Sequence, residues 1–147
     1  MYKLIVLICF GFVDMLSAAE PIDFFGVKPS RSEKSGNTTR YYHSNGSLMG
    51  RAETSGKTTH YYKANGASAG RSDQVGSTTQ FYHSNGSYAG KTVVKGRTTQ
   101  RYYANGKSAG RSETTASGVT QYYKANGSSA GRKEDRGSTS RYYYYNP

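Results

Sequence analysis

The strongest constraint on the fold is a repeat of about twenty residues that runs through most of the chain. Its consensus is G-x-T-T-x-Y-Y-x-x-N-G-x-x-A-G-R-S-x-x-x, with five complete copies and a sixth that is truncated at the C-terminal end. The Asn-Gly dipeptide of the repeat begins at Asn45, Asn65, Asn85, Asn105 and Asn126. Such periodicity predicts an array in which each short unit is stabilised by its neighbours.

Each unit is predicted to form a β-hairpin. Residues 38–44 are rich in Thr and Tyr, which favour strands, and Asn45-Gly46 is a strong signal for a two-residue type I′ turn. Residues 47–54 then return, and Ser55-Gly56 offers a second tight turn. The predicted fold class is all-β: an antiparallel meander of about eleven short strands from five and a half hairpin repeats. A single sheet, a roll and a hairpin solenoid all remain open.

Two-residue turns also predict the register and the two faces of the sheet. Gly50 should face Tyr41 on one side and Tyr61 on the other, and Arg51 should face His60. The face that carries Tyr41 would then alternate rings with glycines, so that each ring shields a neighbouring glycine backbone.

The opposite face should carry the second Tyr of each repeat, together with Met49 and its equivalents, and a row of cations. Arg51 should pair with Glu53, and Arg71 with Asp73, two residues along the same strand. We identify this face as the candidate binding surface. Its residues are Tyr42, Arg51, Tyr62, Arg71, Tyr82, Lys91, Tyr102, Arg111, Tyr123 and Arg132.

The N-terminus is typical of an exported protein. Lys3 precedes the apolar run at residues 4–13, and the small residues 17–19 follow it, as in a secretory signal peptide. The run is too short to span a bilayer. We therefore predict a signal peptide at residues 1–19, an N-terminal linker at residues 20–35 and a hairpin array at residues 36–147. The predicted location is secreted or periplasmic, with no membrane span in the mature form.

The repeat resembles three families of Tyr- and Gly-rich hairpins. Tyr-Tyr-x-x-Asn-Gly-x-x-Ala, as in residues 61–69, is similar to choline-binding cell-wall repeats. Gly-x-Thr-Thr-x-Tyr followed by Gly-Arg resembles Rhs-type YD repeats, and Tyr-Tyr-x-Asn-Gly resembles MORN-variant repeats. The resemblance covers residues 36–146 and implies a β-hairpin binding or structural module. Choline recognition is not implied, because it needs tryptophan and the chain has none. The position after Tyr is not acidic, in contrast to YD repeats.

The sequence predicts no enzyme, no cofactor and no metal. The only cysteine, Cys9, lies in the predicted signal peptide, which leaves the mature chain without a thiol nucleophile or a cysteine ligand. His43 and His83 should lie four strands apart, while His60 should point to the opposite face. The acids stand beside Arg or Lys, as expected for ion-pairing partners, and no phosphate-binding loop is present.

Two functions are consistent with these features. A Tyr and cation face on a chain with a formal net charge of +11 favours an anionic polysaccharide or cell-wall polymer as the partner. Export argues against nucleic acid. The alternative is a structural or assembly protein with a protein partner or further copies of itself. In that case sheets stack edge to edge, or the array is a component of a larger envelope apparatus. Residues 142–145 would supply the uncharged edge strand for such stacking.

Overall fold

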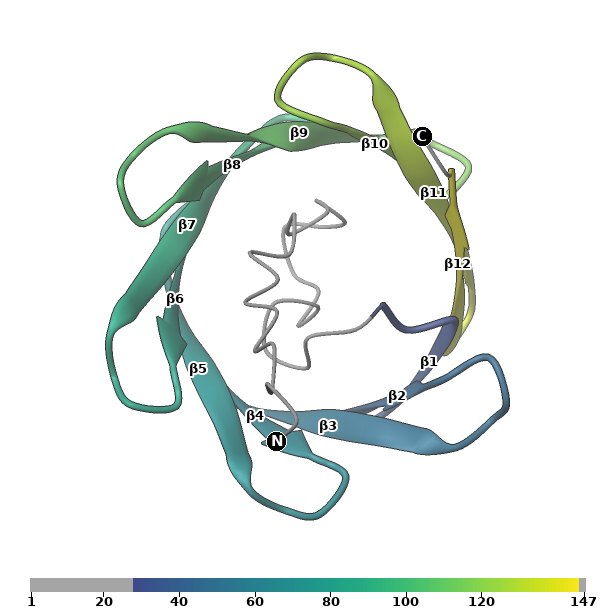
Figure 1. Cartoon of the computed structure of the whole chain (residues 1–147). Helices are drawn as coiled ribbons and strands as arrows, with labels where there is room; N and C mark the ends of the chain where they lie inside the picture. Colours follow the sequence, from purple (N-terminus) through teal and green to yellow (C-terminus); the bar gives the residue numbers. More distant parts are fainter. Residues whose placement is uncertain (1–27, 146–147) are drawn as a thin grey trace, which may run out of the picture.

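The computed structural model describes residues 28–145, which form one closed barrel of twelve antiparallel strands (Figure 1). Each strand pairs with the next along the chain, and β1 pairs with β12. The strands are β1 (Arg31–Ser35), β2 (Thr38–Tyr42), β3 (Leu48–Ser55), β4 (Thr58–Lys63), β5 (Ser68–Val75), β6 (Thr78–His83), β7 (Tyr88–Lys95), β8 (Thr98–Tyr103), β9 (Ser108–Thr114), β10 (Val119–Tyr123), β11 (Ser129–Arg136) and β12 (Thr139–Tyr144). The all-β meander is therefore confirmed, whereas an open sheet, roll or solenoid is wrong.

The barrel is closed by a strand that the repeat consensus did not include. Arg31–Ser35 forms β1 within the segment that the sequence assigned to the linker, and its Ser32 pairs with Tyr41 of β2 and with Ser140 of β12. The first half-repeat therefore completes the truncated last one. β12 pairs with β11 as well as β1, so the open edge strand predicted near residues 142–145 is wrong.

The predicted signal peptide and residues 20–27 of the predicted linker lie outside the described residues. Within residues 28–145, no helix has the length and apolar character needed to cross a membrane.

The turn at Asn45 contains three residues, not two. The His43 amide donates to the Ser47 carbonyl at 3.0 Å, which leaves Ser44, Asn45 and Gly46 in the loop. The Asn45 side-chain oxygen accepts from the Ser47 amide at 3.0 Å and from its hydroxyl at 2.7 Å. Gly46 adopts a φ of +83°, a conformation that glycine tolerates without steric cost.

A β-bulge immediately after this turn restores the predicted pairing. Tyr42 pairs with Leu48, whereas Tyr41 pairs with Gly50, so Met49 is an extra residue on β3. Its side chain is buried, as are those of the equivalent residues Ala69, Ala109 and Ala130. Our expectation that Met49 lies on the same face as Tyr42 is therefore wrong, because the bulge turns this position inward.

The second turn has its tip at Gly56-Lys57, one residue later than predicted. Ser55 pairs with Thr58, and Arg51 consequently faces Tyr62 instead of His60. Gly50 likewise pairs with Lys63, not with Tyr61. The predicted row from Tyr41 through Gly50 to Tyr61 is therefore wrong, and each repeat is shifted by two residues relative to the preceding one.

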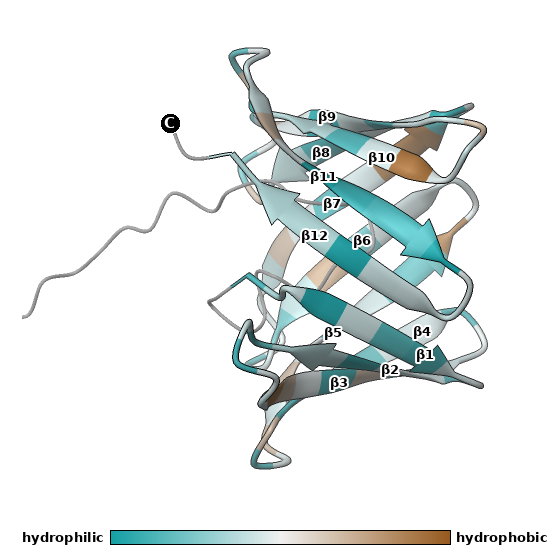
Figure 2. Cartoon of the chain, turned by 90° about the vertical axis from the view of Figure 1, so that its right-hand side faces the viewer, coloured by the Kyte–Doolittle hydropathy of each residue, from teal (hydrophilic) through white to brown (hydrophobic). Residues whose placement is uncertain are grey.

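This shift explains why the sheet closes. Over six hairpins it adds up to a stagger of about twelve residues, equal to the strand number, which inclines the strands by roughly 35–40° and gives a radius of about 11 Å. Figure 2 shows the inclined strands from the side. Because the repeats share the stagger equally, equivalent residues of all repeats lie at one level around the barrel.

The two faces predicted from the sequence become the inside and outside of the wall. A single closed sheet encloses only one face, and the alternate residues Ser32, Ala52, Ser72, Thr92 and Ser112 are buried. An inner ring lies beside them, made of Tyr41, Tyr61, Phe81, Arg101, Tyr122 and Tyr142. Four of its tyrosines are buried, while Phe81 and Arg101 are half-buried.

Candidate functional site

The outer wall carries one side-chain pair that recurs in every repeat. Arg51 of β3 is the direct cross-strand partner of Tyr62 on β4, and its guanidinium lies 4.6 Å from the centre of the Tyr62 ring. This distance is typical of a cation–π interaction. The equivalent pairs are Arg31 with Tyr42, Arg71 with Tyr82, Lys91 with Tyr102, Arg111 with Tyr123 and Arg132 with Tyr143. We call these twelve residues the outer belt.

Carboxylates hold most cations of the outer belt in place. The Arg51 Nε donates to Glu53 at 2.6 Å, and Arg111 contacts Glu113 in the same way at 2.9 Å. Arg71 with Asp73, Arg132 with Glu134 and Arg31 with Glu33 repeat the arrangement. The predicted Arg51–Glu53 and Arg71–Asp73 pairs are therefore confirmed. Each of these guanidiniums lies between an aromatic ring and a carboxylate, and its side chain remains 35–45% exposed.

Asp73 shows how strongly one of these carboxylates is held. It accepts a hydrogen bond from the Thr58 hydroxyl at 2.8 Å and another from the Arg71 guanidinium at 3.2 Å. The Thr58 hydrogen bond, followed by the interaction with Arg71, lowers the pKa of Asp73 below its usual value. Asp73 is therefore ionised at neutral pH and neutralises part of the positive charge of the belt.

Lys91 differs from the other cations of the outer belt. Its ammonium lies 5.6 Å from the Tyr102 ring centre, but Val93 occupies the position where the other repeats have an acid. Within the described residues Lys91 has no carboxylate partner. An incoming anion would therefore meet no competing carboxylate at this repeat.

All ten sequence-predicted site residues lie on the outer wall, and the structure pairs each cation with a ring on the following strand. Sequence reasoning missed Arg31 and Tyr143, which complete the belt at the β1–β12 junction. The sequence contains the information needed to find Arg31, because Arg31-Ser32-Glu33 repeats the pattern of Arg51-Ala52-Glu53 about twenty residues earlier. It also missed the cross-strand ring contacts, because the predicted register placed Arg51 opposite His60.

The described residues offer no assembled metal centre. No group of three or more His, Cys, Asp or Glu side chains within residues 28–145 is placed to hold a metal ion. His60 is exposed on β4 and pairs with Glu53 and Arg71 across the sheet. The arrangement can provide aromatic surface, positive charge and hydrogen bonds.

No protein-family model matches the chain, and no curated protein matches its sequence.

Proposed function

We propose that this protein is an exported, non-enzymatic binding protein whose outer belt binds an anionic polysaccharide or cell-wall polymer. The observation that carries this proposal is the recurrence of one exposed ring–cation pair in six equivalent positions around the wall. A polymer presents the same group many times, so successive pairs can bind successive units. Such multivalency raises the overall affinity even where each contact is weak.

The chemistry of each pair fits a charged sugar unit. A tyrosine ring can stack on the C–H face of a sugar and offers a hydroxyl at its edge. The adjacent guanidinium presents several N–H donors, and one of them is already used by the carboxylate on the same strand. The remaining donors can reach a uronate, phosphate or sulfate group, while the bound carboxylate keeps the attraction moderate.

The alternative, an assembly that grows by edge-to-edge strand pairing, requires an open strand. Every strand within residues 28–145 is paired on both sides. We therefore favour the binding function.

Binding to polygalacturonate, a polymer of uronic acid units, tests the proposal. Replacing Arg51, Arg71 and Arg111 with Gln should weaken binding about tenfold at low salt and flatten its salt dependence, because fewer counterions are released. Replacing their partners, with Glu53→Gln, Asp73→Asn and Glu113→Gln, should strengthen binding, because the guanidiniums lose their competing carboxylates.

The matched control replaces the exposed Lys57, Lys95 and Lys107 with Gln, which removes the same number of charges away from the belt. This set should lose much less affinity than the arginine set. Equal losses would mean that binding follows net charge alone, and the belt would have no special role. Absence of salt-dependent binding to the unaltered protein would contradict the proposal directly.

A further inference from the structure

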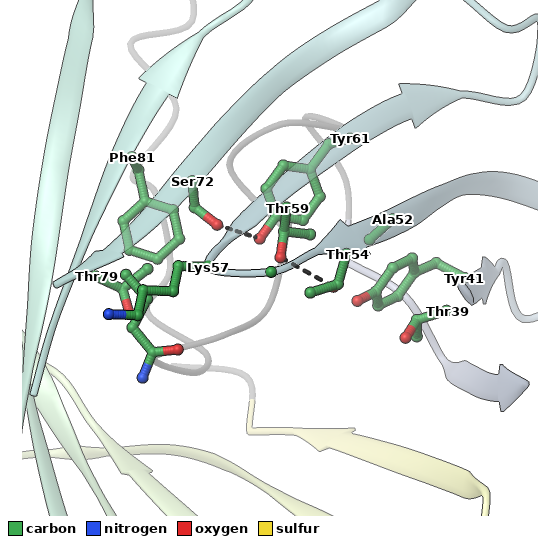
Figure 3. A pocket seen from close by; sticks show the side chains of 12 residues that line it. Thr39, Tyr41, Ala52, Thr54, Lys57, Thr59, Tyr61, Ser72, Thr79 and Phe81 are labelled. Carbon is green, nitrogen blue, oxygen red and sulfur yellow. Dashed lines mark hydrogen bonds between the residues drawn. The ribbon is translucent and has the colours of Figure 1, made fainter. Parts of the chain in front are cut away.

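We propose a second binding site inside the barrel for one neutral sugar. The sugar would pack against aromatic side chains of the inner ring and form hydrogen bonds with rows of hydroxyl groups. A cavity of about 240 Å³ lies against strands β2 to β6 (Figure 3). This volume suits a single six-membered sugar ring and is smaller than the pockets that hold drug-sized ligands. The cavity lies on the inner wall and shares no residue with the outer belt.

Aromatic rings from three successive repeats contribute to the cavity wall. Tyr41, Tyr61 and Phe81 occupy the same position in their repeats and lie at one level around the barrel. A pyranose has an apolar C–H face that packs on such rings, and its hydroxyls project from the edge. Rings on the wall therefore provide the apolar half of a sugar site.

Hydroxyl groups provide the polar half. Thr39, Thr59 and Thr79 form one row along the cavity. Thr54 and Thr59 share a hydrogen bond of 3.0 Å, as shown by the dashed line between them in Figure 3. A hydroxyl can donate once and accept twice, so a paired hydroxyl keeps capacity for a further partner. Sugar hydroxyls have the same dual capacity, which makes these rows complementary to them.

The Tyr61 hydroxyl and Ser72 Oγ lie 3.0 Å apart in the same cavity, within hydrogen-bonding distance. This contact holds the Tyr61 ring in a fixed orientation, because it joins the end of the ring to the neighbouring strand. A preorganised ring loses little side-chain freedom when a ligand binds.

The absence of acidic side chains from the cavity lining defines the ligand class further. None of the described lining residues is acidic, so nothing there favours a cation, and the one lysine, Lys57, lies at the tip of a turn. The charged residues Lys34, Arg101, Lys133 and Asp135 also lie on the inner wall, on β1, β8 and β11, and are outside the lining. With no carboxylate and a single lysine in its described lining, the cavity favours a neutral ligand over a cation.

Two neighbouring repeats provide a matched pair of variants. Thr79 and Thr99 occupy the same inward position on β6 and β8, but only Thr79 lines the cavity. Thr79→Val removes one hydroxyl from the proposed site, and Thr99→Val removes the equivalent hydroxyl elsewhere. Their effects on the fold should be alike, since both positions are half-buried.

The experiment titrates the protein with glucose, galactose, mannose and N-acetylglucosamine at high salt and follows backbone amide resonances by NMR. At least one sugar should give saturable shifts at residues of β2 to β6. Thr79→Val should weaken that binding about fivefold or more, whereas Thr99→Val should leave it unchanged. Equal weakening by both variants, or no saturable shift with any of the four sugars, would overturn the proposal.

High salt separates this site from the outer belt. Binding of a neutral sugar should not change with salt, while polyuronate binding should fall steeply. The Arg51, Arg71 and Arg111 substitutions should leave sugar binding intact. Loss of one activity without the other would therefore identify which of the two proposed sites is wrong.

Discussion

Replacing Gly90 with alanine is expected to lower the free energy of unfolding by about 2–4 kcal/mol, because two separate costs combine. Gly90 has a φ of +142°, which a residue with a side chain rarely adopts. A Cβ atom at this position would also collide with the backbone carbonyl oxygen of Tyr102 on β8. Backbone cannot move aside as a flexible side chain can. Equilibrium urea denaturation of the purified protein measures the effect.

Gly86→Ala is the matched control, because it lies in the same repeat and also has a positive φ, of +83°. A Cβ atom there would meet no atom within 4 Å, so only the conformational cost of about 1 kcal/mol remains. If both variants lost the same stability, that result would contradict the close approach of the β7 and β8 backbones at Gly90.

Replacing Arg101 with Phe is expected to raise the free energy of unfolding by about 1–3 kcal/mol at neutral pH. Arg101 occupies the inner-ring position that holds Phe81 in the preceding repeat and Tyr122 in the following one. Burial lowers the pKa of Arg101 to about 10, so the folded barrel disfavours its charged form. Phenylalanine removes that cost and restores the aromatic position. Arg97→Gln, which removes a charge from an exposed turn, should change stability by less than about 0.5 kcal/mol.

The stability difference between the Arg101→Phe variant and the unaltered protein should depend on pH with a defined sign. The pKa of Arg101 in the folded protein lies below its pKa in the unfolded chain, because burial disfavours the charged form. Between these values the unfolded chain binds more protons, so the unaltered protein gains stability relative to the variant as pH rises. The advantage of the variant should be full below about pH 10 and shrink above it. An advantage that grows at high pH would contradict a cost due to buried charge.

Local chemistry allowed much of the wall to be predicted. Alternating Thr and Tyr identified the strands, Asn-Gly marked one set of turns, and the period of two separated Tyr41 from Tyr42 onto opposite faces. The ion pair of Arg51 with Glu53 followed from the same period, because residues two apart on a strand share a face. Each of these features depends only on residues close together in sequence.

The register could be predicted across the first turn but not across the second. At the first turn, two deviations from the expected geometry compensate for each other. The loop at Asn45 has one residue more than expected, and the bulge at Met49 absorbs it, so the pairing of Tyr41 with Gly50 was correct. At Gly56-Lys57 no bulge compensates, and the pairing shifted by two residues. The Arg51–Tyr62 contact, which defines the outer belt, exists only because of this shift.

Closure of the barrel was the largest feature that sequence reasoning missed. It depends on pairing between β1 and β12, which are more than a hundred residues apart, and no local pattern encodes such a contact. Arg31–Ser35 also lacks the Tyr-Tyr and Asn-Gly markers of the repeat, because it is only the returning half of a unit. The stagger of two residues per repeat determines whether the two end strands meet.

The most direct test of this account is a disulfide across the junction between β1 and β12, in a Cys9→Ser background. Glu33 and Thr139 are directly paired, and the adjacent Lys34 amide donates to the Ser138 carbonyl, so they form a non-hydrogen-bonded pair with Cα atoms about 4.5 Å apart. This distance suits a disulfide.

The double variant Glu33→Cys with Thr139→Cys should oxidise to an intramolecular disulfide in the monomer, as measured by non-reducing electrophoresis and by the mass of the alkylated protein. The control pairs Glu33→Cys with Thr98→Cys, which has the same repeat position on β8, and it should keep two free thiols. Free thiols in the first variant, or disulfides formed only between molecules, would show that the hairpin array does not close into a barrel.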